Sequence, residues 1–451
     1  MKKLLLFCCL TTTFLQAQDF WVEYSTSQPL ANTGISSISI VDDNVTWLNM
    51  ACGTTGCTPI RRYSRTIDSG ITWATGTIDL GADSEHLRIT NISGVSAEVA
   101  YAAAYPDAAG VLGGVWKTAD GGSSWAREAS AVFSDPASHP GLVHFWNDND
   151  GIVMGNPTNG YFEIYVTTNN GNLWTRVPSS TALIPINPEE SLFTNNFTVT
   201  DNMLWAMTTF GRILRSADKG MNWTVSQSPI TDFSVEPNAL ITVDLAFTDP
   251  NNGLLQTSDL RLFRSSDGGA TWNTLEYVGV ARSLGIAAIP GLPDTYISIG
   301  EDLNGVRGSS YTTDAGLNWV DINDNPDTNY VNGSVIEMHS SYIGFAGGFS
   351  VAPTVGGIFR WDNMGCSCST TGFSGGKCMV TTPKQTSGVL NISGNNITQV
   401  DIADLSGKQI LSAQYQQLNE VNVDISDFTN GVYVVRVTND KGISVVKVMK
   451  Q

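Results

Sequence analysis

Short apolar runs, separated by polar turns, recur along most of this 451-residue chain. The runs are rich in β-branched and aromatic residues, and the turns between them contain Gly, Asn or Asp, which is typical of strands joined by hairpins. Four successive examples are residues 241–247 (ITVDLAF), 253–257 (GLLQT), 261–265 (RLFRS) and 271–277 (TWNTLEY). No helical segment is expected among them, so the pattern predicts an all-β protein.

An eight-residue phrase, Ser/Thr-x-Asp/Asn-x-Gly-x-x-Trp, occurs six times, and its closing tryptophans lie about 49 residues apart. Each residue type suits a tight hairpin. The Asp or Asn side chain can accept hydrogen bonds from backbone N–H groups one or two residues on, and Gly supplies the positive φ of the turn. Trp enters the next strand as a large apolar plug whose N–H needs a partner. We predict a structural role for Asp68, Gly70, Trp73, Asp120, Gly122, Trp125, Asn169, Gly171, Trp174, Asp218, Gly220, Trp223, Asp267, Gly269, Trp272, Asp314, Gly316 and Trp319.

The repeated phrase resembles the Asp-box, or bacterial neuraminidase repeat, of β-propellers. A strand-rich repeat of this length is typical of sheets repeated radially around an axis, with four short strands forming one blade. The resemblance and the period together predict a β-propeller.

The two ends of the repeat region predict how this ring closes. Residues 357–365 match the approach to a box, with Asn363 and Gly365 in the Asp and Gly positions, but no Trp follows. The missing Trp-led strand occurs instead at residues 20–27 (FWVEYSTS). Because an unclosed ring leaves an exposed sheet edge, we predict seven blades within residues 19–365, with the N-terminal strand completing the last one.

The N-terminus predicts export. Residues 1–18 contain two lysines, then an apolar stretch and a small, polar region, which is the pattern of a signal peptide. No other stretch has the roughly 20 apolar residues that a transmembrane helix needs. We therefore expect no transmembrane segment.

The chain changes character near residue 384, after a Cys/Gly/Ser-rich linker at 366–383. The tryptophans and the 49-residue period stop, and alternating strands predict a second domain, a small Ig-like sandwich at 384–451. The strands expected there are 388–392, 397–405, 421–425, 431–437 and 443–448.

Phrases within residues 384–451 closely resemble the type A C-terminal sorting domain of the Bacteroidetes type IX secretion system. The residues that carry the resemblance are Asp404, Gly407, Lys408, Gly431, Tyr433, Lys447 and Lys450. The resemblance implies that the type IX machinery at the outer membrane recognises this domain, and that the passenger is released outside the cell or anchored at its surface. The alternative is a generic Ig-like module that spaces the propeller.

Five cysteines remain after removal of the signal peptide. In an oxidising compartment we expect Cys52 and Cys57 to staple one loop. Cys378 is expected to pair with Cys366 or Cys368, which leaves one thiol. A zinc site is not favoured, because these three cysteines have no histidine nearby.

Charge narrows the choice of partners. The formal net charge of −18 and the pI near 4.5 argue against nucleic-acid binding, which relies on clustered Lys and Arg. The acidic turns at 41–44 and 321–327 could hold Ca²⁺ through carboxylate and carbonyl oxygens, or could be solvated turns. No other cofactor is expected.

Catalytic motifs are scarce. The Asp-box resemblance includes sialidases, which hold the substrate carboxylate with arginines, yet the first inner strand at 35–41 has no Arg, and no Arg-Ile-Pro phrase occurs. Other glycoside hydrolases need two carboxylates about 5 to 10 Å apart. The weak candidates on predicted inner strands or their loops are Asp244, Asp302 and Glu337, each of which could instead be an exposed carboxylate at a strand end.

Two functional classes remain. The favoured one is a secreted or surface-held, non-catalytic propeller that binds an unidentified glycan, peptide or protein. The alternative is an extracellular glycoside hydrolase or lyase that acts on polysaccharide. Tyr105, Tyr161, Phe210 and Tyr330 in loops could stack on sugars, although a packing role is favoured for each.

Overall fold

The structure is a computed structural model of the full chain. It describes residues 20–53, 59–135, 137–178, 183–231, 233, 241–322, 333, 335–341, 343–361, 380–381, 385–386, 388–404, 408–439 and 442–450. Regular structure in these residues consists of strands, apart from one 3₁₀ turn, η1 (Ser84–His86). Contacts divide the chain into one compact unit of residues 20–362 and another that contains residues 363–451.

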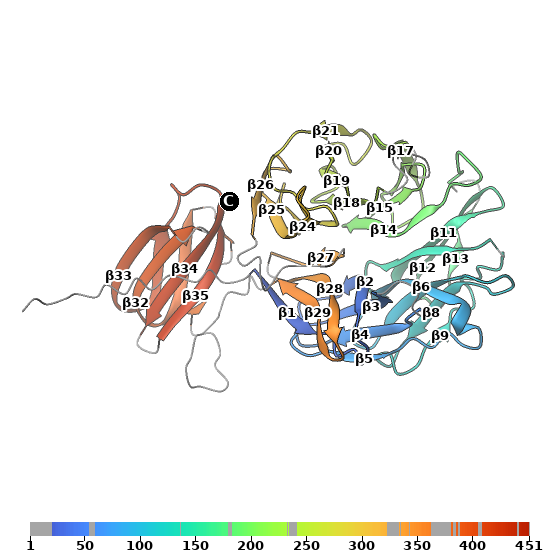
Figure 1. The fold of residues 1–451 in the computed structure, drawn as a ribbon, viewed down its shortest axis with the longest axis horizontal. Coiled ribbons are helices and arrows are strands. Elements are labelled where there is room, and N and C mark those ends of the chain that lie inside the picture. The colour runs from blue at the N-terminus through green and yellow to red at the C-terminus, as the bar shows by residue number, and fades with distance from the viewer. Residues whose placement is uncertain are drawn as a thin grey trace, which may run out of the picture. The chain divides into compact units, whose positions relative to one another are not determined.

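The first unit consists of sheets arranged around a common centre (Figure 1). Its strands are β1 (Trp21–Ser25), β2 (Thr33–Ile40), β3 (Thr46–Cys52), β4 (Arg62–Thr66), β5 (Ala74–Thr77), β6 (Leu87–Gly94), β7 (Ala100–Pro106), β8 (Gly114–Thr118), β9 (Ala126–Arg127), β10 (Pro140–Phe145), β11 (Asp150–Thr158), β12 (Tyr161–Thr168), β13 (Thr175–Arg176), β14 (Leu192–Thr200), β15 (Met203–Thr208), β16 (Arg212–Ser216), β17 (Thr224–Gln227), β18 (Val243–Phe247), β19 (Gly253–Thr257), β20 (Leu262–Ser265), β21 (Asn273–Leu275), β22 (Val278–Gly279), β23 (Gly285–Ala288), β24 (Tyr296–Glu301), β25 (Arg307–Thr312), β26 (Asn318–Asp321), β27 (Ile336–Met338), β28 (Gly344–Ala352) and β29 (Val355–Trp361).

Strands that follow one another in sequence are neighbours in these sheets. Four sheets have the orders β6-β7-β8-β9, β10-β11-β12-β13, β14-β15-β16-β17 and β18-β19-β20-β21, and in a fifth β22 extends the order β23-β24-β25-β26. An eight-stranded sheet contains the halves β2-β3-β4-β5 and β27-β28-β29-β1, joined through the pair Gly34 and Phe349. The first strand of each group lies toward the centre, as β2, β14, β18 and β27 show in Figure 1.

The N-terminal strand pairs with the far end of the unit, as the sequence predicts. β1 runs antiparallel to β29, with Trp21 opposite Trp361 and Ser25 opposite Gly357. The Trp361 ring also stacks on Phe20, with centroids 5.2 Å apart. The degraded box expected at 357–365 lies outside the described residues from position 362 onward.

The six boxes share one set of hydrogen bonds, illustrated by the first. The Thr66 hydroxyl donates to Asp68 Oδ1 over 2.8 Å and accepts from the Gly70 N–H over 2.9 Å. Asp68 Oδ1 also accepts from the N–H of Thr72, 2.8 Å away. The carboxylate therefore reaches four residues on, farther than the one or two that the sequence suggested. Two consecutive residues with positive φ, Ser69 at 61° and Gly70 at 83°, turn the chain back toward it.

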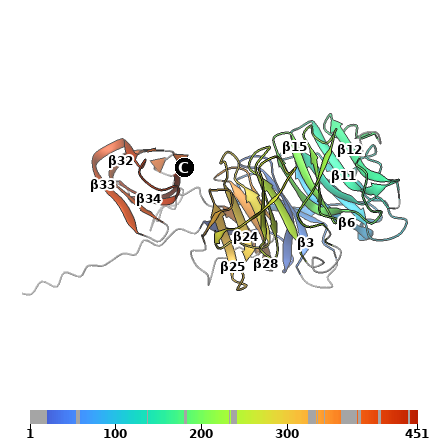
Figure 2. The same cartoon turned by 90° about the horizontal axis from the view of Figure 1, so that it is seen from above.

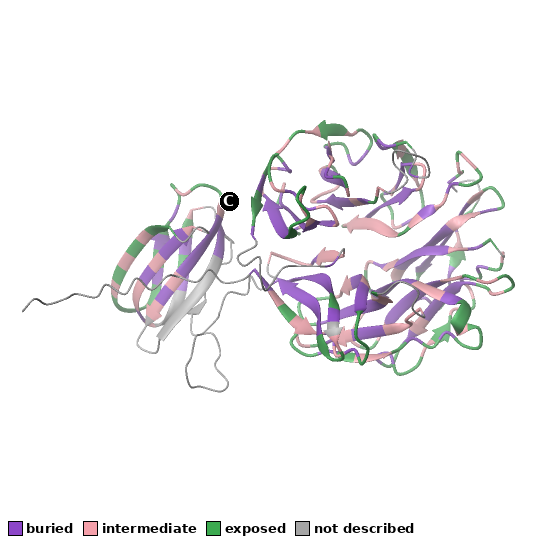
Figure 3. Cartoon of the chain, in the orientation of Figure 1, coloured by how far each residue is buried: buried purple, intermediate pink, exposed green. Residues whose placement is uncertain are grey.

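Tryptophans of the boxes pack between sheets. Trp73 contacts Phe345 on β28 with ring centroids 5.7 Å apart, and Trp174 contacts Tyr101 on β7 at 6.2 Å. Tyr101 belongs to the sheet adjacent to that of Trp174, and Phe345 belongs to the other half of the eight-stranded sheet, so these rings fill the junctions between four-stranded groups. Buried residues run along the strands, whereas exposed residues gather in the outer turns (Figure 3).

The C-terminal unit has a sheet of its own, which curls strongly (Figure 2). Its strands are β30 (Val380–Thr381), β31 (Gln385–Thr386), β32 (Val389–Asp404), β33 (Gln409–Asp424), β34 (Gly431–Asn439) and β35 (Gly442–Lys450). The order is β30-β32-β34-β35-β31, and β33 pairs with β32. Apolar residues from β32, β33, β34 and β35 form its core, including Leu390, Val423, Val435 and Val448.

Two expectations for this sheet are wrong. The strands predicted at 388–392 and 397–405 are one continuous strand, β32, because the chain passes through an irregularity at Asn396, with φ of 53°, without leaving the ladder. The first part of β33 was missed. Residues 409–420 are polar and mostly exposed, so they lack the apolar alternation of a half-buried strand.

Candidate functional site

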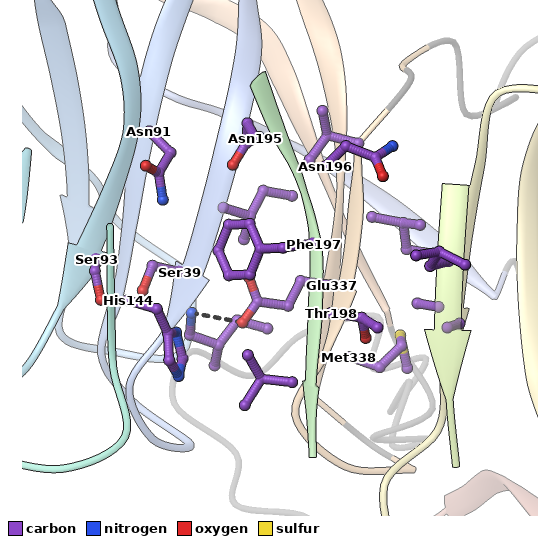
Figure 4. A pocket seen from close by; sticks show the side chains of 18 of the residues that line it. Ser39, Asn91, Ser93, His144, Asn195, Asn196, Phe197, Thr198, Glu337 and Met338 are labelled. Atoms are coloured by element: carbon purple, nitrogen blue, oxygen red, sulfur yellow. Dashed lines mark hydrogen bonds between the residues drawn. The ribbon is translucent and has the colours of Figure 1, made fainter. Parts of the chain in front are cut away.

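A channel with a volume of about 1430 Å³ occupies the centre of the first unit. It is lined by the innermost strands β2, β6, β10, β14, β18, β23 and β27. Because side chains alternate between the two faces of a strand, each of these strands contributes several positions to the lining. Figure 4 shows Asn91, Ser93 and His144 on one side, and Phe197 and Glu337 farther along the wall.

The lining is acidic or neutral. Among the described residues that line the channel there is no lysine or arginine, whereas there are six carboxylates: Asp42, Asp148, Asp201, Asp244, Asp249 and Glu337. Burial lowers the pKa of His144 to about 4, so this imidazole is uncharged at neutral pH. The channel therefore has no fixed positive charge in its described lining.

Polar side chains join successive innermost strands. Ser37 Oγ on β2 accepts from the Ile92 N–H on β6 over 3.2 Å, and Ser93 Oγ on β6 accepts from the Phe145 N–H on β10 over 3.0 Å. Asn91 pairs with both backbone groups of Val143. Each bond satisfies a backbone group that a sheet edge would otherwise leave open.

Two of the predicted catalytic candidates take part in this series. Asp244 Oδ2 on β18 accepts from the Ile286 N–H on β23 over 3.0 Å, and Oδ1 accepts from the Leu245 N–H over 2.8 Å. Glu337 Oε1 on β27 accepts from the Ile40 N–H on β2 over 3.2 Å. Each carboxylate thus joins its own strand to the next innermost strand, β23 for Asp244 and β2 for Glu337.

Burial changes the protonation of these two acids. It raises the pKa of Asp244 to about 6, against the opposing effect of the two backbone N–H groups. It raises the pKa of Glu337 to about 8, because the loss of water disfavours the charged carboxylate and a single backbone N–H opposes this only in part. At neutral pH Asp244 is mostly ionised and Glu337 is mostly protonated. Their strands are separated by β23.

The third candidate lies elsewhere. Asp302 directly follows β24, which is a second strand rather than an innermost one, and it does not line the channel. Its Oδ1 accepts from the N–H groups of Asn304 and Val306, and its carboxylate lies 3.9 Å from Arg282. The expectation of an inner-strand position is wrong for Asp302, because the alternating pattern does not reveal which strand of a repeat is innermost.

A bulge in β14 crosses the channel. Leu192 pairs with Thr208 and Phe197 pairs with Ala206, so residues 193–196 stand opposite a single residue of β15. Asn195, with φ of 56°, donates from Nδ2 to the Ser36 carbonyl on β2 over 2.9 Å. β6 and β10 lie between β2 and β14 around the ring. Sequence reasoning missed this bridge, although two adjacent asparagines, which are disfavoured in strands, are a signal of irregularity.

The loop aromatics have different positions. Tyr105 lines the channel and stacks on His139 with centroids 3.8 Å apart, and Tyr161 contacts the Arg176 guanidinium at 5.2 Å. Phe210 is half-buried in the turn after β15, and Tyr330 lies outside the described residues. Of the three predicted aromatics that the structure describes, it brings Tyr105 to the channel.

The cysteine pairings stay predictions. Cys52 ends β3, and Cys57, Cys366, Cys368 and Cys378 lie outside the described residues.

The Ca²⁺ site is also untested. In the acidic turn at 41–44, Asp42 Oδ1 accepts from the N–H groups of Asn44 and Val45. The turn at 321–327 lies outside the described residues from position 323 onward. In the described part of the chain, no three His, Cys, Asp or Glu side chains are grouped so that they could hold a metal ion.

The residues that carried the sorting-domain resemblance lie on the C-terminal sheet or beside it. Asp404 ends β32 and accepts from the Lys408 N–H over 3.0 Å. The Tyr433 hydroxyl donates to the Thr429 carbonyl over 2.7 Å. Gly431 begins β34, Lys447 and Lys450 lie on β35, and Gly407 is outside the described residues.

Comparison with solved structures indicates the fold. The structure "YCF48 bound to D1 peptide" is 17% identical and has a TM-score of 0.51, covering 76% of this chain and 97% of its own. YCF48 from Cyanidioschyzon merolae is 16% identical with a TM-score of 0.53, covering 76% and 99%. Both are β-propeller-like, and at this identity the likeness concerns the fold alone. A xyloglucanase from Xanthomonas campestris is 12% identical over 92% of this chain and 74% of its own, but its TM-score of 0.25 is too low to support an argument.

Comparison with sequence families identifies the C-terminal segment. No curated protein matches the chain. Within the described residues, no helix is both long and apolar enough to cross a membrane. Residues 383–451 match the family described as "Secretion system C-terminal sorting domain". The protein thus carries a type IX sorting domain and is exported to the cell surface or the extracellular space.

Proposed function

We propose that this protein is a non-catalytic binding protein in which a seven-bladed Asp-box propeller holds a ligand in its central channel. The division of the eight-stranded sheet into two four-stranded halves supports seven blades, since five further sheets surround the same channel. The six repeated boxes support the same number, because β1 pairs with β29 and so forms the outermost strand of the one four-stranded group that has no complete box. We further propose that residues 384–451 form an Ig-like sorting domain, with 366–383 as the linker.

The use of the channel acids supports binding over catalysis. A glycoside hydrolase needs one carboxyl group as acid and a second as base or nucleophile, both with oxygens free to meet the substrate. Both oxygens of Asp244 accept hydrogen bonds from backbone N–H groups, and one oxygen of Glu337 does the same. The bonds from Ile286 to Asp244 and from Ile40 to Glu337 join neighbouring innermost strands in the same way as the hydroxyls of Ser37 and Ser93. A role in joining blades therefore accounts for both acids.

One observation favours the second candidate, an extracellular hydrolase or lyase. The pKa of Glu337, raised to about 8, would keep this carboxyl group protonated at neutral pH, as a general acid requires. The other candidate acid of the channel wall is poorly placed as its partner, because Asp244 lies two innermost strands away with both oxygens accepting backbone N–H groups. Binding is therefore the better-supported function.

The test combines binding with turnover. The purified full chain is screened against extracellular polysaccharides by affinity electrophoresis, while reducing ends and the ultraviolet absorbance of unsaturated products are followed. Peptide and protein ligands are screened in parallel by pull-down from defined mixtures. We expect retention by at least one ligand without product release. Product release that is lost in Glu337→Gln and kept in Asp302→Asn would instead establish a hydrolase or lyase.

A further inference from the structure

The channel combines one bridged end with a particular set of hydrogen-bonding groups. We propose that it is a blind pocket for an uncharged carbohydrate that enters from the face of the Asp-boxes, and that Glu337 donates a hydrogen bond to this ligand. The inference rests on the proposed binding function of the same channel. It adds the class of ligand, the direction of entry and a residue that determines specificity.

The direction of entry follows from the bridge between Asn195 and Ser36. Both residues lie in the first halves of their strands, β14 and β2, and Ser36 is the first residue of β2 in the channel lining. In the described part of the chain theirs is the hydrogen bond that crosses the channel. The other ends of the innermost strands run into turns that bind the boxes, as in the Ser69 N–H donating to the Asn44 carbonyl over 3.0 Å. The bulge thus forms a floor, and the mouth opens toward the boxes.

Charge excludes anionic ligands at this mouth. Asp42, Asp148, Asp201 and Asp249 line the channel at or just beyond the ends of the innermost strands, and no lysine or arginine lies among the described lining residues. Like charges at the rim of a low-dielectric channel repel a uronate, sialate or sulfate group.

The deeper wall does not favour a cation either. Asp244 has both oxygens engaged by backbone N–H groups, and Glu337 is mostly protonated at neutral pH. His144 is neutral. Among the described lining residues, the lower part of the channel therefore offers an ammonium or guanidinium group only Asp244, whose two oxygens already accept backbone N–H groups, and an uncharged ligand fits it best.

The groups that remain free suit a sugar. Ser39 and Ser93 accept N–H groups through Oγ, so their O–H bonds remain available to donate. Asn195 donates through Nδ2, which leaves its carbonyl oxygen as an acceptor. Phe197 adds an aromatic ring to the same wall (Figure 4). Hydroxyl donors, an amide acceptor and an aromatic ring together match the hydroxyls and the apolar face of a pyranose ring.

Glu337 completes this set as a protonated donor. β23 and β28, which flank it, carry no titratable residue among their described positions, so they supply no partner for the acid. The titratable groups on the other elements around it are Asp42 after β2, Asp201 after β14, Asp244 on β18, His144 on β10 and His339 after β27. Burial raises the pKa of Glu337, and the Ile40 N–H opposes this effect only in part.

The test measures affinity against ligand charge and pH. Isothermal titration calorimetry of the full chain uses cellohexaose, xylohexaose, laminarihexaose and mannohexaose as neutral probes, and hexagalacturonate and sialyllactose as anionic probes. We expect at least one neutral probe to bind about tenfold or more tightly than either anionic probe. Affinity should fall from about pH 7 to about pH 9 as Glu337 ionises and ceases to donate.

Three variants isolate the role of Glu337. Glu337→Gln retains a donor, so its affinity should stay near the wild-type value and no longer change with pH. Glu337→Ala should bind about tenfold more weakly at both pH values. Asp302→Asn, outside the channel, is the matched control and should behave as wild type.

Several results would overturn the inference. One is equal or stronger binding of an anionic probe, and another is the absence of binding by every neutral probe. A third is a Glu337→Gln protein that has the circular dichroism spectrum of the wild type and whose ligand affinity still falls with pH as it does in the wild type. The screens of polysaccharides and proteins could also detect a ligand whose affinity is the same for the wild type, Glu337→Ala and Ser93→Ala. In that case the binding function stands and the channel inference fails.

Discussion

The indole N–H of Trp21 donates to the hydroxyl of Ser309 over 2.9 Å, and this bond joins residues 288 positions apart. Trp21 lies on β1, at the edge of the last sheet, and Ser309 lies on β25 of the sheet before it. Trp174 also lies at a junction between adjacent sheets, and Trp73 lies at the junction between the two halves of the eight-stranded sheet. The N-terminal strand therefore provides the last sheet with the kind of contact that box tryptophans provide elsewhere.

Removal of this contact should weaken the whole first unit. Trp21→Ala should lower the free energy of unfolding by about 3 kcal/mol or more, since it empties a buried aromatic site between two sheets. Deletion of residues 20–25 should have a larger effect, because it also exposes the edge of β29. Urea unfolding followed by tryptophan fluorescence measures both. Glu23→Ser, an exposed change on the same strand, is the control, and a Trp21→Ala protein as stable as this control would contradict the prediction.

Two glycines of the same sheet separate backbone strain from packing. Gly110, with φ of +85°, has no atom within 4 Å of an added Cβ, whereas at Gly122, with φ of +92°, the added atom would lie 2.2 Å from the Tyr63 ring. Gly110→Ala should cost about 1 kcal/mol through the positive φ alone. Gly122→Ala should cost at least about 2 kcal/mol more, because the box must move away from Tyr63. Urea unfolding of both variants provides the comparison. Equal decreases in the free energy of unfolding would show that the Tyr63 ring moves aside at no cost.

Stability should depend on pH through Glu337. Its pKa is raised from the ordinary 4.5 to about 8 in the folded protein, so between these values the folded state holds a proton that the unfolded state has lost. The contribution of Glu337 to stability is complete below about pH 4.5 and is lost as pH rises toward 8. Glu337→Gln should therefore gain stability relative to wild type across this window. Urea midpoints at several pH values test this, and a constant difference between the two proteins would argue against a buried, protonated Glu337.

The C-terminal segment should determine localisation. Deletion of residues 383–451 removes the matched sorting domain and should leave the protein inside the outer membrane. Cell fractionation with an antibody to the first unit measures the distribution. A substitution in the first unit, Asp302→Asn, is the control and should leave export unchanged. A truncated protein that still reaches the surface would show that a second export signal exists.

The sequence by itself determined the local chemistry of the repeats. A box is a set of contacts within eight residues, in which a hydroxyl, a carboxylate and a glycine with positive φ satisfy one another, so the pattern alone predicts the turn. The Trp-led phrase at residues 20–27 likewise sufficed to predict the pairing of β1 with the end of the first unit. The C-terminal resemblance predicted export, which the match of residues 383–451 confirms.

Only the tertiary structure decided the properties of the channel. Its lining comes from seven strands distributed over three hundred residues, so neither the lack of positive charge nor the bridge from Asn195 to Ser36 follows from any local pattern. The pKa of Glu337 depends on how much water the surrounding strands exclude. Asp302 follows β24, a second strand that does not border the channel. Turn geometry depends on near neighbours in the chain, whereas burial and electrostatic interactions depend on neighbours in space, and these are fixed only when the ring closes.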